Sequence, residues 1–484
     1  MTEEKQGLTF YGTNLFALLP LIIFAVFCVL FFVVFKVFEM DTLAMGGFVA
    51  LGACSILAKK QGRYWEAVIK GMSSPMVSLL ALILLMVGIF AKLMAKGGVA
   101  QGFVWLGSIM GLHGGIFVAF TFVITALMAT ATGTSIGTLF SAFPILYPSG
   151  ILLGAHPTIL AGAILSGAIF GDNIGPISDT TIASCSTQNY TKKKGTADIG
   201  GAVTSRMRYA LAAGLVALVL FAVFGGAGTG DPAGQEILSQ YTNPKGLIML
   251  IPVSLLLAMA IVKRDIFIAI VWGTICGIII GLISGILVPA DIISVKEGSL
   301  TGFCYDGIRS MLGMVGYLYG IAGIMGVLTE SGTLDKLIRA LLNSRLARTE
   351  AGSELIIALG VMISSISMGA ANGPAIVMFG PIANEIGQAK KLHPYRRANL
   401  LDGCAATLPV VIPVISAFIF IVITIIDGLK GEYGFIQSVN PVFIALTTFH
   451  CLALFVVFAF SIISGWGRRY EGEQGEPVKQ KPAA

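Results

Sequence analysis

Charged residues are scarce in this chain of 484 residues: 12% are Asp, Glu, Lys or Arg, whereas 56% are hydrophobic. So apolar a composition excludes a soluble protein built around one buried core. Apolar runs close to the roughly 20 residues that cross a bilayer recur from one end of the chain to the other. The composition therefore predicts an all-α polytopic membrane protein, with the lipid bilayer as its main partner and no sizeable soluble domain.

Cysteine and histidine are also few, and neither shows a spacing that binds metal. The seven cysteines and four histidines are scattered along the chain, unlike the clustered ligands of a zinc site or the paired cysteines of a disulfide framework. We expect the cysteines to be small packing residues and expect no cofactor. The net charge of +6 does not indicate a nucleic-acid partner, because the basic residues form short tracts between apolar segments, where membrane orientation accounts for them.

The N-terminal stretch MTEEKQGLTFYGTNL lacks the basic region and the cleavage site of a secretory signal, so the first apolar run is expected to remain as a span. Ten segments have the length and composition of spans. Their approximate bounds are 14–36, 43–58, 72–95, 157–185, 204–226, 246–262, 266–288, 307–330, 398–427 and 441–464. Two further apolar segments, 116–150 and 354–388, are each interrupted by a glycine cluster and are expected to be re-entrant hairpins or pairs of full spans.

Lysine and arginine are rare in alternate loops, which sets the expected orientation of the chain. The loops poor in these residues are 37–42, 227–245, 289–306 and 428–440. The loops between them hold the basic residues, which are Lys59 to Lys70, Lys192 to Lys194, Lys263 and Arg264, Lys336 to Arg348, Lys390 to Arg397, and Arg468 and Arg469. Because basic loops stay in the cytoplasm, we expect both termini there, in a bacterial-type inner (plasma) membrane.

The two halves of the chain share one plan. Four pairs of prolines and histidines are separated by 237 residues: Pro144 and Pro381, His156 and His393, Pro157 and Pro394, and Pro176 and Pro413. Within the interrupted segments, Gly133 and Gly369 are separated by 236 residues, as are Gly137 and Gly373. Each half holds five expected crossings, an odd number, so the second half enters the membrane from the opposite face. Such inverted repeats are typical of secondary transporters, whose substrates bind near the midplane.

The expected domains follow from this repeat. They are a first inverted repeat at 1–230 with a hairpin at 116–150 and a broken helix at 157–185, a second at 240–466 with a hairpin at 354–388 and a broken helix at 398–427, and a cytoplasmic tail at 467–484. The predicted fold class is an all-α polytopic membrane protein with two inverted-topology repeats, about ten full spans, two re-entrant hairpins and two broken helices.

The stretch FGDNIGPISDTT, residues 170–181, places two carboxylates beside an expected helix break. Proline removes an amide donor and glycine adds backbone freedom, so Gly175 and Pro176 predict an interruption. Pro409 and Pro413 predict a break at the matching place of the second half. Carbonyls freed by such breaks cannot face lipid, and they must line a polar cavity or lie within protein.

The two carboxylates belong to the first half only, because Asp172 and Asp179 align with Pro409 and Ser416. A carboxylate inside a bilayer is costly unless it has a partner, and burial favours the protonated form, which lets the group exchange a proton. Sodium prefers oxygen ligands, so Na⁺ and H⁺ are expected to compete for this stretch. The expected cation- and proton-binding residues are Asp172, Asp179, Ser178, Thr180, Thr181 and Asn173, with Na⁺ at Asp179 and Asp172.

Residues at the helix breaks are expected to line the path of the ion or substrate: Thr132, Gly133, Thr134, Ser135, Gly175, Pro176, Asn372, Gly373, Pro409 and Pro413. Simpler roles stay open for several residues. Asp179 can serve as an N-cap, Asp172 as a brace for the break, and the threonines and serine at 132–135 as hydrogen-bond formers between helices. Lys92 is expected to be the one basic residue clearly inside a span, so no membrane-buried arginine is expected to await an anionic substrate.

The stretch Gly171 to Thr181 resembles the motif of the NhaC-type sodium/proton antiporter family, in which Gly-Asp is followed by a variable pair, Ser-Pro, an apolar residue and Ser-Asp-Thr-Thr. Gly175 stands where the family often has serine, which takes away one hydroxyl ligand. The resemblance covers nearly the whole chain in span order and repeat plan. It implies sodium coupling by alternating access and no enzymatic activity, and relatives in the family include malate/lactate exchangers and amino-acid transporters.

Two transport hypotheses follow. In the first, the protein is an antiporter that exchanges Na⁺ for H⁺ at a membrane-buried aspartate site by alternating access. In the second, the same cation site drives transport of a small organic acid or amino acid. An ion channel lined by the two breaks and an intramembrane aspartyl protease fit less well, the latter because Ile169 replaces an expected glycine and the Tyr305–Asp306 pair follows rather than precedes. A homodimer is compatible with the sequence.

Overall fold

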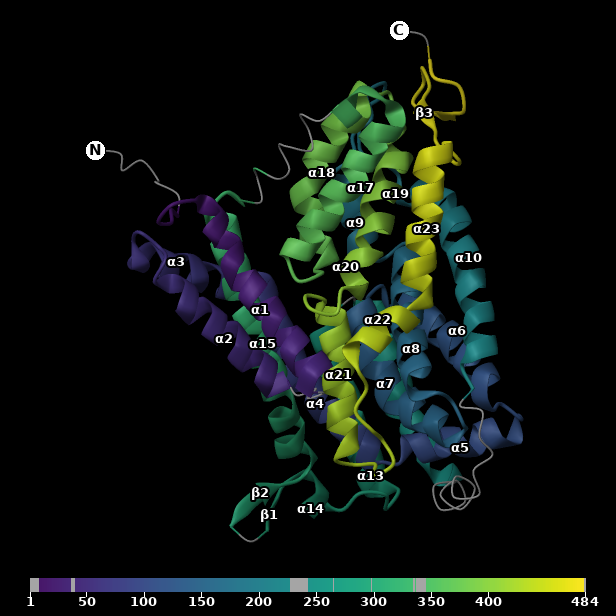
Figure 1. Cartoon of the computed structure of the whole chain (residues 1–484). Coiled ribbons are helices and arrows are strands. Elements are labelled where there is room, and N and C mark those ends of the chain that lie inside the picture. The colour runs from purple at the N-terminus through teal and green to yellow at the C-terminus, as the bar shows by residue number, and fades with distance from the viewer. Residues whose placement is uncertain are drawn as a thin grey trace.

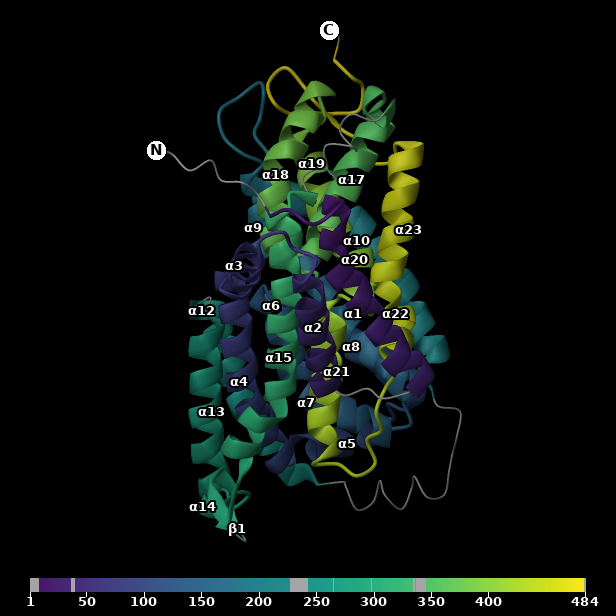
Figure 2. The same cartoon turned by 60° about the vertical axis from the view of Figure 1, so that its left-hand side comes forward.

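The computed structural model describes residues 8–482 except 36–39, 227–242, 264, 297, 334–335 and 337–344. It is mostly α-helical, and most helices run along the long direction of the molecule (Figure 1, Figure 2). Strands in the described ranges form only two short antiparallel hairpins, β1 (Ser294–Lys296) with β2 (Ser299–Thr301) and β3 (Tyr470–Glu471) with β4 (Pro477–Val478). The predicted all-α class is confirmed, whereas the predicted junction of the repeats at 230–240 falls within 227–242, outside the described residues.

Seven described helices are long and apolar enough to cross a membrane, and an eighth span results if the pair α22 and α23, bent by 53°, counts as one. Long apolar helices suit a bilayer because each satisfies its own backbone hydrogen bonds. They are α4 (Pro75–Lys96), α6 (Gly114–Thr132), α7 (Ser135–Leu152), α8 (Pro157–Ile174) continued by α9 (Asp179–Ser186), α10 (Ile199–Phe224), α15 (Phe303–Glu330) and α17 (Glu350–Ser367), with α22 (Pro441–Thr447) and α23 (Phe449–Ser464) as the bent pair.

Besides the predicted broken helix at 398–427, which divides into three short helices, four of the ten predicted spans fold as shorter helices, so the number ten stays a prediction. They are α1 (Leu19–Val29), α2 (Met40–Ser55), α12 (Leu250–Lys263) and α13 (Ile266–Ile283). The remaining elements are α3 (Gln61–Met72), α5 (Val99–Ile109), α14 (Pro289–Ile292), α18 (Asn372–Ala389), α19 (Pro394–Ala405), α20 (Leu408–Val411) and α21 (Ala417–Lys430), the 3-10 helices η1 (Asn14–Leu18), η3 (Pro244–Met249) and η4 (Arg345–Arg348), and the π-helix η2 (Leu30–Phe35).

Both glycine-interrupted segments fold as pairs of helices, α6 with α7 and α17 with α18. Gly133 ends α6 with a φ of 69°, and Gly369 follows α17 with a φ of 66°. This left-handed conformation is strained for residues with a side chain and natural for glycine. The glycine clusters therefore place a sharp turn at the tip of each pair, as the sequence predicted.

The packing brings the two halves of the chain into contact. α15 packs along α2, α3 and α4, and α6 packs against α8 and α10. A Cβ atom added at Gly88 of α4 would meet the backbone of Gly307 in α15, and such small residues let membrane helices approach closely. In the upper part of Figure 1, α19 contacts α9 and α10. Residues of the second half thereby reach the break between α8 and α9.

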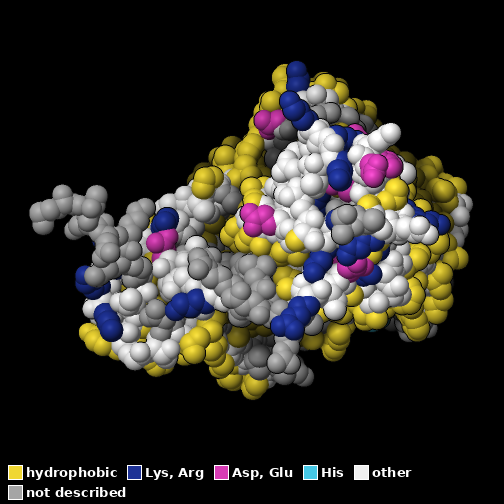
Figure 3. Space-filling model, turned by 90° about the horizontal axis from the view of Figure 1, so that it is seen from above, with side chains coloured by type: hydrophobic (Ala, Val, Ile, Leu, Met, Phe, Trp, Pro, Cys, Tyr) yellow, Lys and Arg dark blue, Asp and Glu magenta, His cyan; other side chains and the backbone are white. Residues whose placement is uncertain are grey.

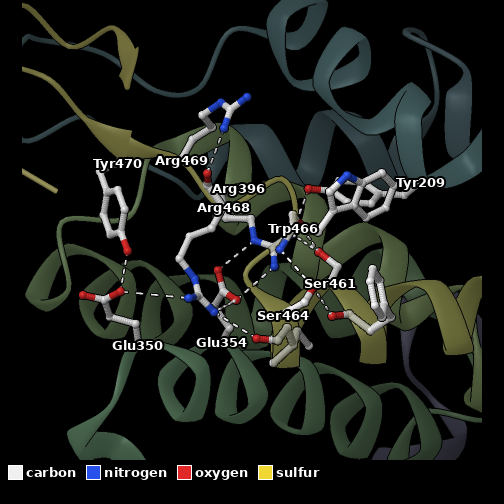
Figure 4. Close-up of polar contacts among 12 residues, drawn as sticks. Tyr209, Glu350, Glu354, Arg396, Ser461, Ser464, Trp466, Arg468, Arg469 and Tyr470 are labelled. Atoms are coloured by element: carbon white, nitrogen blue, oxygen red, sulfur yellow. Dashed lines mark hydrogen bonds and ion pairs between the residues drawn. The ribbon is translucent and has the colours of Figure 1, made fainter. Parts of the chain in front are cut away.

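The C-terminal tail folds back over the ends of α17 and α19, at the top of Figure 1. Figure 4 shows how it is held: Arg396 forms two hydrogen bonds with the fully buried Glu354, of 2.8 and 2.9 Å, and Arg468 of the tail donates to the same carboxylate at 2.8 Å. Tyr470 donates to Glu350 at the start of α17. Figure 3 looks down on this end, where basic and acidic side chains lie across the surface and hydrophobic ones along its rim.

Candidate functional site

The predicted break in the first half is present between α8 and α9. α8 ends at Ile174, Gly175 and Ser178 have extended backbones, and α9 begins at Asp179. Pro176 has no amide hydrogen to donate, so carbonyls near the end of α8 need partners other than the next helical turn. The break therefore exposes backbone oxygen atoms inside a helical region, as the sequence predicted.

The tip of the first helix pair sits on this break. A Cβ atom at Gly133 would lie 2.9 Å from both Cγ1 and the carbonyl oxygen of Ile177. Thr130 Oγ1 donates to the Gly171 carbonyl at 3.1 Å, which joins α6 to α8 just before the break. The absence of a side chain at Gly133 thus permits direct contact between the tip and the unwound segment.

The second half repeats this arrangement of tip and break without the two aspartates. α19 ends at Ala405, the short helix α20 contains Pro409, and Pro413 lies in the unwound segment before α21. The amide of Ala417 donates to the Gly369 carbonyl at 3.1 Å, so the second tip is bonded to the second break. Each break therefore carries a glycine tip from a helix pair of its own half.

Asn372 braces the second tip. Its amide nitrogen, oriented toward the surrounding acceptors, donates to Ser365 Oγ at 2.7 Å, to the Ala370 carbonyl at 3.1 Å and to the Ala405 carbonyl at 3.0 Å. Gly373 follows it at the start of α18, and no atom lies within 4 Å of the place where a Cβ would stand. The tip is therefore held by hydrogen bonds at Asn372, whereas the backbone of Gly373 has no close neighbour on its Cβ side.

Asp172 lies in the last turn of α8, where it faces the start of α7. Its Oδ2 accepts a hydrogen bond of 2.9 Å from Ser135 Oγ. Its Oδ1 is buried and has no hydrogen-bond partner among the described residues. A buried acceptor without a partner is uncommon in proteins. It leaves one carboxylate oxygen available to a proton or a cation.

Most of the other hydroxyl groups of the predicted site residues bond to their own neighbours along the chain. Ser178 Oγ and Thr180 Oγ1 lie 3.0 Å apart. At the first tip, Thr132 Oγ1 lies 3.0 Å from Thr138 Oγ1, and Thr134 caps α7 by accepting from the Gly137 amide. The tip threonines thus support the turn, whereas Ser135 reaches Asp172 directly.

Asp179 occupies different surroundings. It is the first residue of α9, and its side chain is exposed, as is that of Pro176. It forms no hydrogen bond or ion pair with any residue that the structure describes. Ser178, and not Asp179, is the N-cap residue of α9. Asp172 and Asp179 therefore belong to one break but not to one hydrogen-bonded cluster.

A second buried cluster adjoins the first and was not predicted. Arg206 of α10, fully buried, forms an ion pair with Asp402 of α19, which is 2% exposed. Asn173 Nδ2 approaches Asp402 Oδ1 at 3.5 Å, and Thr181 Oγ1 donates to Asp402 Oδ2 at 3.1 Å. Of the predicted site residues, Asn173 and Thr181 thus join this ion pair rather than Asp172.

The expectation that no arginine is buried is wrong. Arg206 lies two residues inside the predicted span 204–226, at its expected end, whereas α10 begins at Ile199 and carries Arg206 into the interior. Lys92 also has partners within the protein. Its Nζ donates to the Gly428 carbonyl at 2.7 Å and forms an ion pair of 3.2 Å with Glu432. Asp402 lies 196 residues from Arg206 along the chain, so no local sequence pattern predicts that the two residues pair.

The chemistry of the cluster suits a hard monovalent cation better than a transition metal. No group of three or more His, Cys, Asp or Glu placed to hold a metal ion occurs in the part of the chain that the structure describes. The seven cysteines are free. Around Asp172 the available ligands are carboxylate, hydroxyl and carbonyl oxygens, which sodium prefers. Sodium here would be cargo, held mainly by Asp172 with Ser135 and Ser178 nearby.

The chain is similar in sequence to several antiporters. The Malate-2H(+)/Na(+)-lactate antiporter of Bacillus subtilis is 30% identical over 285 residues, which are 56% of this chain and 58% of that protein. The Na(+)/H(+) antiporter NhaC of Alkalihalophilus pseudofirmus is 24% identical over 349 residues, 67% of this chain and 72% of the relative. The arginine/ornithine antiporter ArcD of Halobacterium salinarum is 28% identical over 167 residues, 34% of this chain and 33% of the relative.

Among solved structures, the YdaH transporter of Alcanivorax borkumensis matches 93% of this chain and 99% of its own, with 14% identity and a TM-score of 0.35, a likeness too low to establish a shared fold. The model of the Na+/H+ antiporter family matches residues 8–225 and 236–460, nearly the whole chain. The resemblance carried by the aspartate stretch is therefore confirmed, and the chain belongs to the Na+/H+ antiporter family.

Proposed function

We propose that this protein is a secondary active transporter that exchanges Na⁺ for H⁺ at a membrane-buried aspartate site, with Asp172 as the group that both ions occupy. Membership of the Na+/H+ antiporter family supports sodium and proton as the transported ions. The free, buried Oδ1 of Asp172 supplies the acceptor. Asp179, exposed beside the same break, is then the carboxylate that receives the cation from solution.

The observation that carries this proposal is the charge balance of the two adjoining clusters. Together they hold two carboxylates, half-buried Asp172 with its buried Oδ1 and buried Asp402, and one guanidinium, Arg206, which pairs with Asp402. With Asp172 ionised, one negative charge is left over, and an unbalanced buried charge is strongly disfavoured. A single sodium ion or a single proton restores neutrality, but not both. Competition for one site is what an exchange of the two ions requires.

Alternating access would come from the repeated scaffold. We propose two inverted repeats, about ten full spans and both termini in the cytoplasm, in a plasma membrane. The arrangement of a glycine tip on a helix break, present at Gly133 with Ile177 and at Gly369 with Ala417, supports the repeat. The lysines and arginines at the end shown in Figure 3 support a cytoplasmic position for that end.

A second candidate is sodium-coupled exchange of a small organic acid or amino acid at the same cation site. It is favoured by the names of two relatives, which exchange malate and lactate or arginine and ornithine. A Cβ added at Gly373, at the start of α18, would meet no neighbouring atom, and a helix N-terminus attracts a carboxylate. Asp172 would keep the same role in both candidates.

The test uses purified protein in sealed vesicles that contain a pH-sensitive dye. Sodium, lithium or potassium is added without any organic solute, and the internal pH is followed. The proposal predicts a prompt pH change with sodium that Asp172→Asn abolishes while leaving insertion intact. A sodium response that survives in Asp172→Asn contradicts the assignment of the site. Sodium entry that begins only when a carboxylic or amino acid is added identifies the second candidate instead.

A further inference from the structure

We propose that Arg206 and Asp402 are positioning residues for the cation site, which hold the break between α8 and α9 in the geometry that presents Asp172. The inference rests on the proposed function and assigns a role to two residues outside the aspartate stretch. Both carboxylate oxygens of Asp402 already have partners in the network around Arg206. The effect of the two residues on transport is exerted through the backbone and side chains of the break.

The guanidinium of Arg206, on α10, bonds to residues of three other helices. Its Nη1 donates to the Asn173 carbonyl at 2.6 Å and to Thr181 Oγ1 at 2.9 Å, besides pairing with Asp402. Its Nε donates to Asn399 Oδ1 at 3.0 Å. Arg206 stands on α10, Asn173 on α8, Thr181 on α9, and the other two partners on α19. A single side chain thus bonds both sides of the break to the second half of the chain.

The bond to the Asn173 carbonyl gives a physical reason for an arginine at this position. In an unbroken helix this oxygen would accept from the amide four residues later, but α8 ends at Ile174. Arg206 supplies the missing donor. Asn173 follows Asp172 directly, so Arg206 holds the backbone one residue after this carboxylate.

Asp402 completes the arrangement in two ways. It neutralises Arg206, because a buried guanidinium without a counter-ion is strongly disfavoured. Its charge also acts on Asp172, which lies close enough for the two carboxylates to interact. Removal of Asp402 would therefore alter the charge balance at Asp172 as well as the position of the break.

The hydrogen-bonding groups around the Arg206–Asp402 pair are not all satisfied. Arg206 Nη2 and Asn173 Oδ1 are both buried and have no hydrogen-bond partner among the described residues. Unpaired buried groups are costly, and native networks retain them mainly at functional sites. Two such atoms lie beside the break.

The test compares the apparent KM for sodium with the maximal rate in the vesicle assay. Arg206→Lys keeps the positive charge but loses the fork that reaches Asn173, Thr181 and Asn399 together. We expect its KM for sodium to rise about tenfold, with a maximal rate within about twofold of the wild type. Arg208→Lys, a partly buried arginine on the same helix whose Nε donates to the Ser205 carbonyl, is the matched control and should leave the KM unchanged.

A double variant, Arg206→Met with Asp402→Leu, is a second test that is less prone to misfolding, because it leaves no uncompensated buried charge. Its KM should rise as in Arg206→Lys, and its thermal unfolding is measured alongside. A wild-type KM in either folded variant overturns the inference. Aggregation of both variants while Arg208→Lys stays folded also overturns it, since the pair would then be needed for folding. If the wild-type protein itself shows no sodium-dependent pH change, the proposed function fails first, whatever the variants do.

Discussion

Asp172 and Asp179 show how two aspartates of one motif acquire different chemistry from their surroundings. Asp172 is held by Ser135 at the start of α7 and keeps one buried oxygen free, whereas Asp179 is exposed at the first turn of α9. Burial makes the charge of a carboxylate depend on a bound cation or proton, and exposure removes that dependence. This difference is the reason that the proposed function gives binding to Asp172 and access to Asp179.

Ser135→Ala should weaken sodium binding because it removes a hydroxyl that lies 2.9 Å from Asp172 and that is placed to share a cation with it. Hydrogen bonds to charged groups contribute about 1.5–3 kcal/mol, so an affinity loss of about tenfold is expected. Ser141→Ala is the control, since Ser141 lies on the same helix and donates only to the carbonyls of Gly137 and Thr138. Sodium titration of the purified variants measures the effect, and equal losses in both variants would contradict it.

At the residue scale, the sequence located the aspartate stretch but not its partners. The motif and the helix-breaking residues Gly175 and Pro176 are local, so they could be read along the chain. Arg206 and Asp402 could not, because their pairing depends on the contact between α10 and α19. The polar groups of Asn173 and Thr181 were identified, but the ion pair that they join was not.

The helix pairs and breaks act as units at the scale of elements. Each tip contacts the break of its own half through a glycine in the left-handed conformation. The sequence predicted both turns, because a glycine cluster inside an apolar run favours a turn over a continuous helix. It did not predict the contact between tip and break, which depends on the packing of α6 against α8 and of α17 against α19.

Gly133→Ala should destabilise the protein more than Gly369→Ala. Both residues have a positive φ, which costs a residue with a side chain about 1–2 kcal/mol. At Gly133 the new methyl group would also lie 2.9 Å from Ile177, whereas at Gly369 the nearest atom is the Ile415 carbonyl oxygen at 3.8 Å. Thermal unfolding in detergent measures the two losses, and a larger loss for Gly369→Ala would show that the first tip does not rest on the break.

At the scale of the whole molecule, the tail and the charged end form a cap over α17 and α19. Buried Glu354 receives hydrogen bonds from Arg396 of α19 and Arg468 of the tail (Figure 4). His393, the N-cap of α19, lies under the same tail: its Nε2 is 3.2 Å from the Gly475 carbonyl, and its Nδ1 accepts from the Tyr395 amide at 3.2 Å. Only the neutral imidazole can make both bonds.

Burial lowers the pKa of His393 from 6.5 to about 4. The unfolded chain therefore binds more protons than the folded one between these values, and stability is lost as the pH falls from about 6.5 toward 4. We expect a loss of about 1–3 kcal/mol over this window. His393→Asn keeps an N-cap acceptor and should reduce the pH dependence of thermal unfolding, whereas the matched His156→Asn should not. An unchanged pH dependence in His393→Asn would show that the tail does not bury this ring.

The central claim is that sodium and a proton compete for Asp172. It is tested most directly by titrating sodium into the purified protein in two buffers of different ionisation enthalpy and counting the protons released for each sodium bound. The account predicts release that approaches a single proton at low pH in the wild type and in Asp179→Asn, and neither binding nor release in Asp172→Asn. Proton release that persists in Asp172→Asn would contradict it.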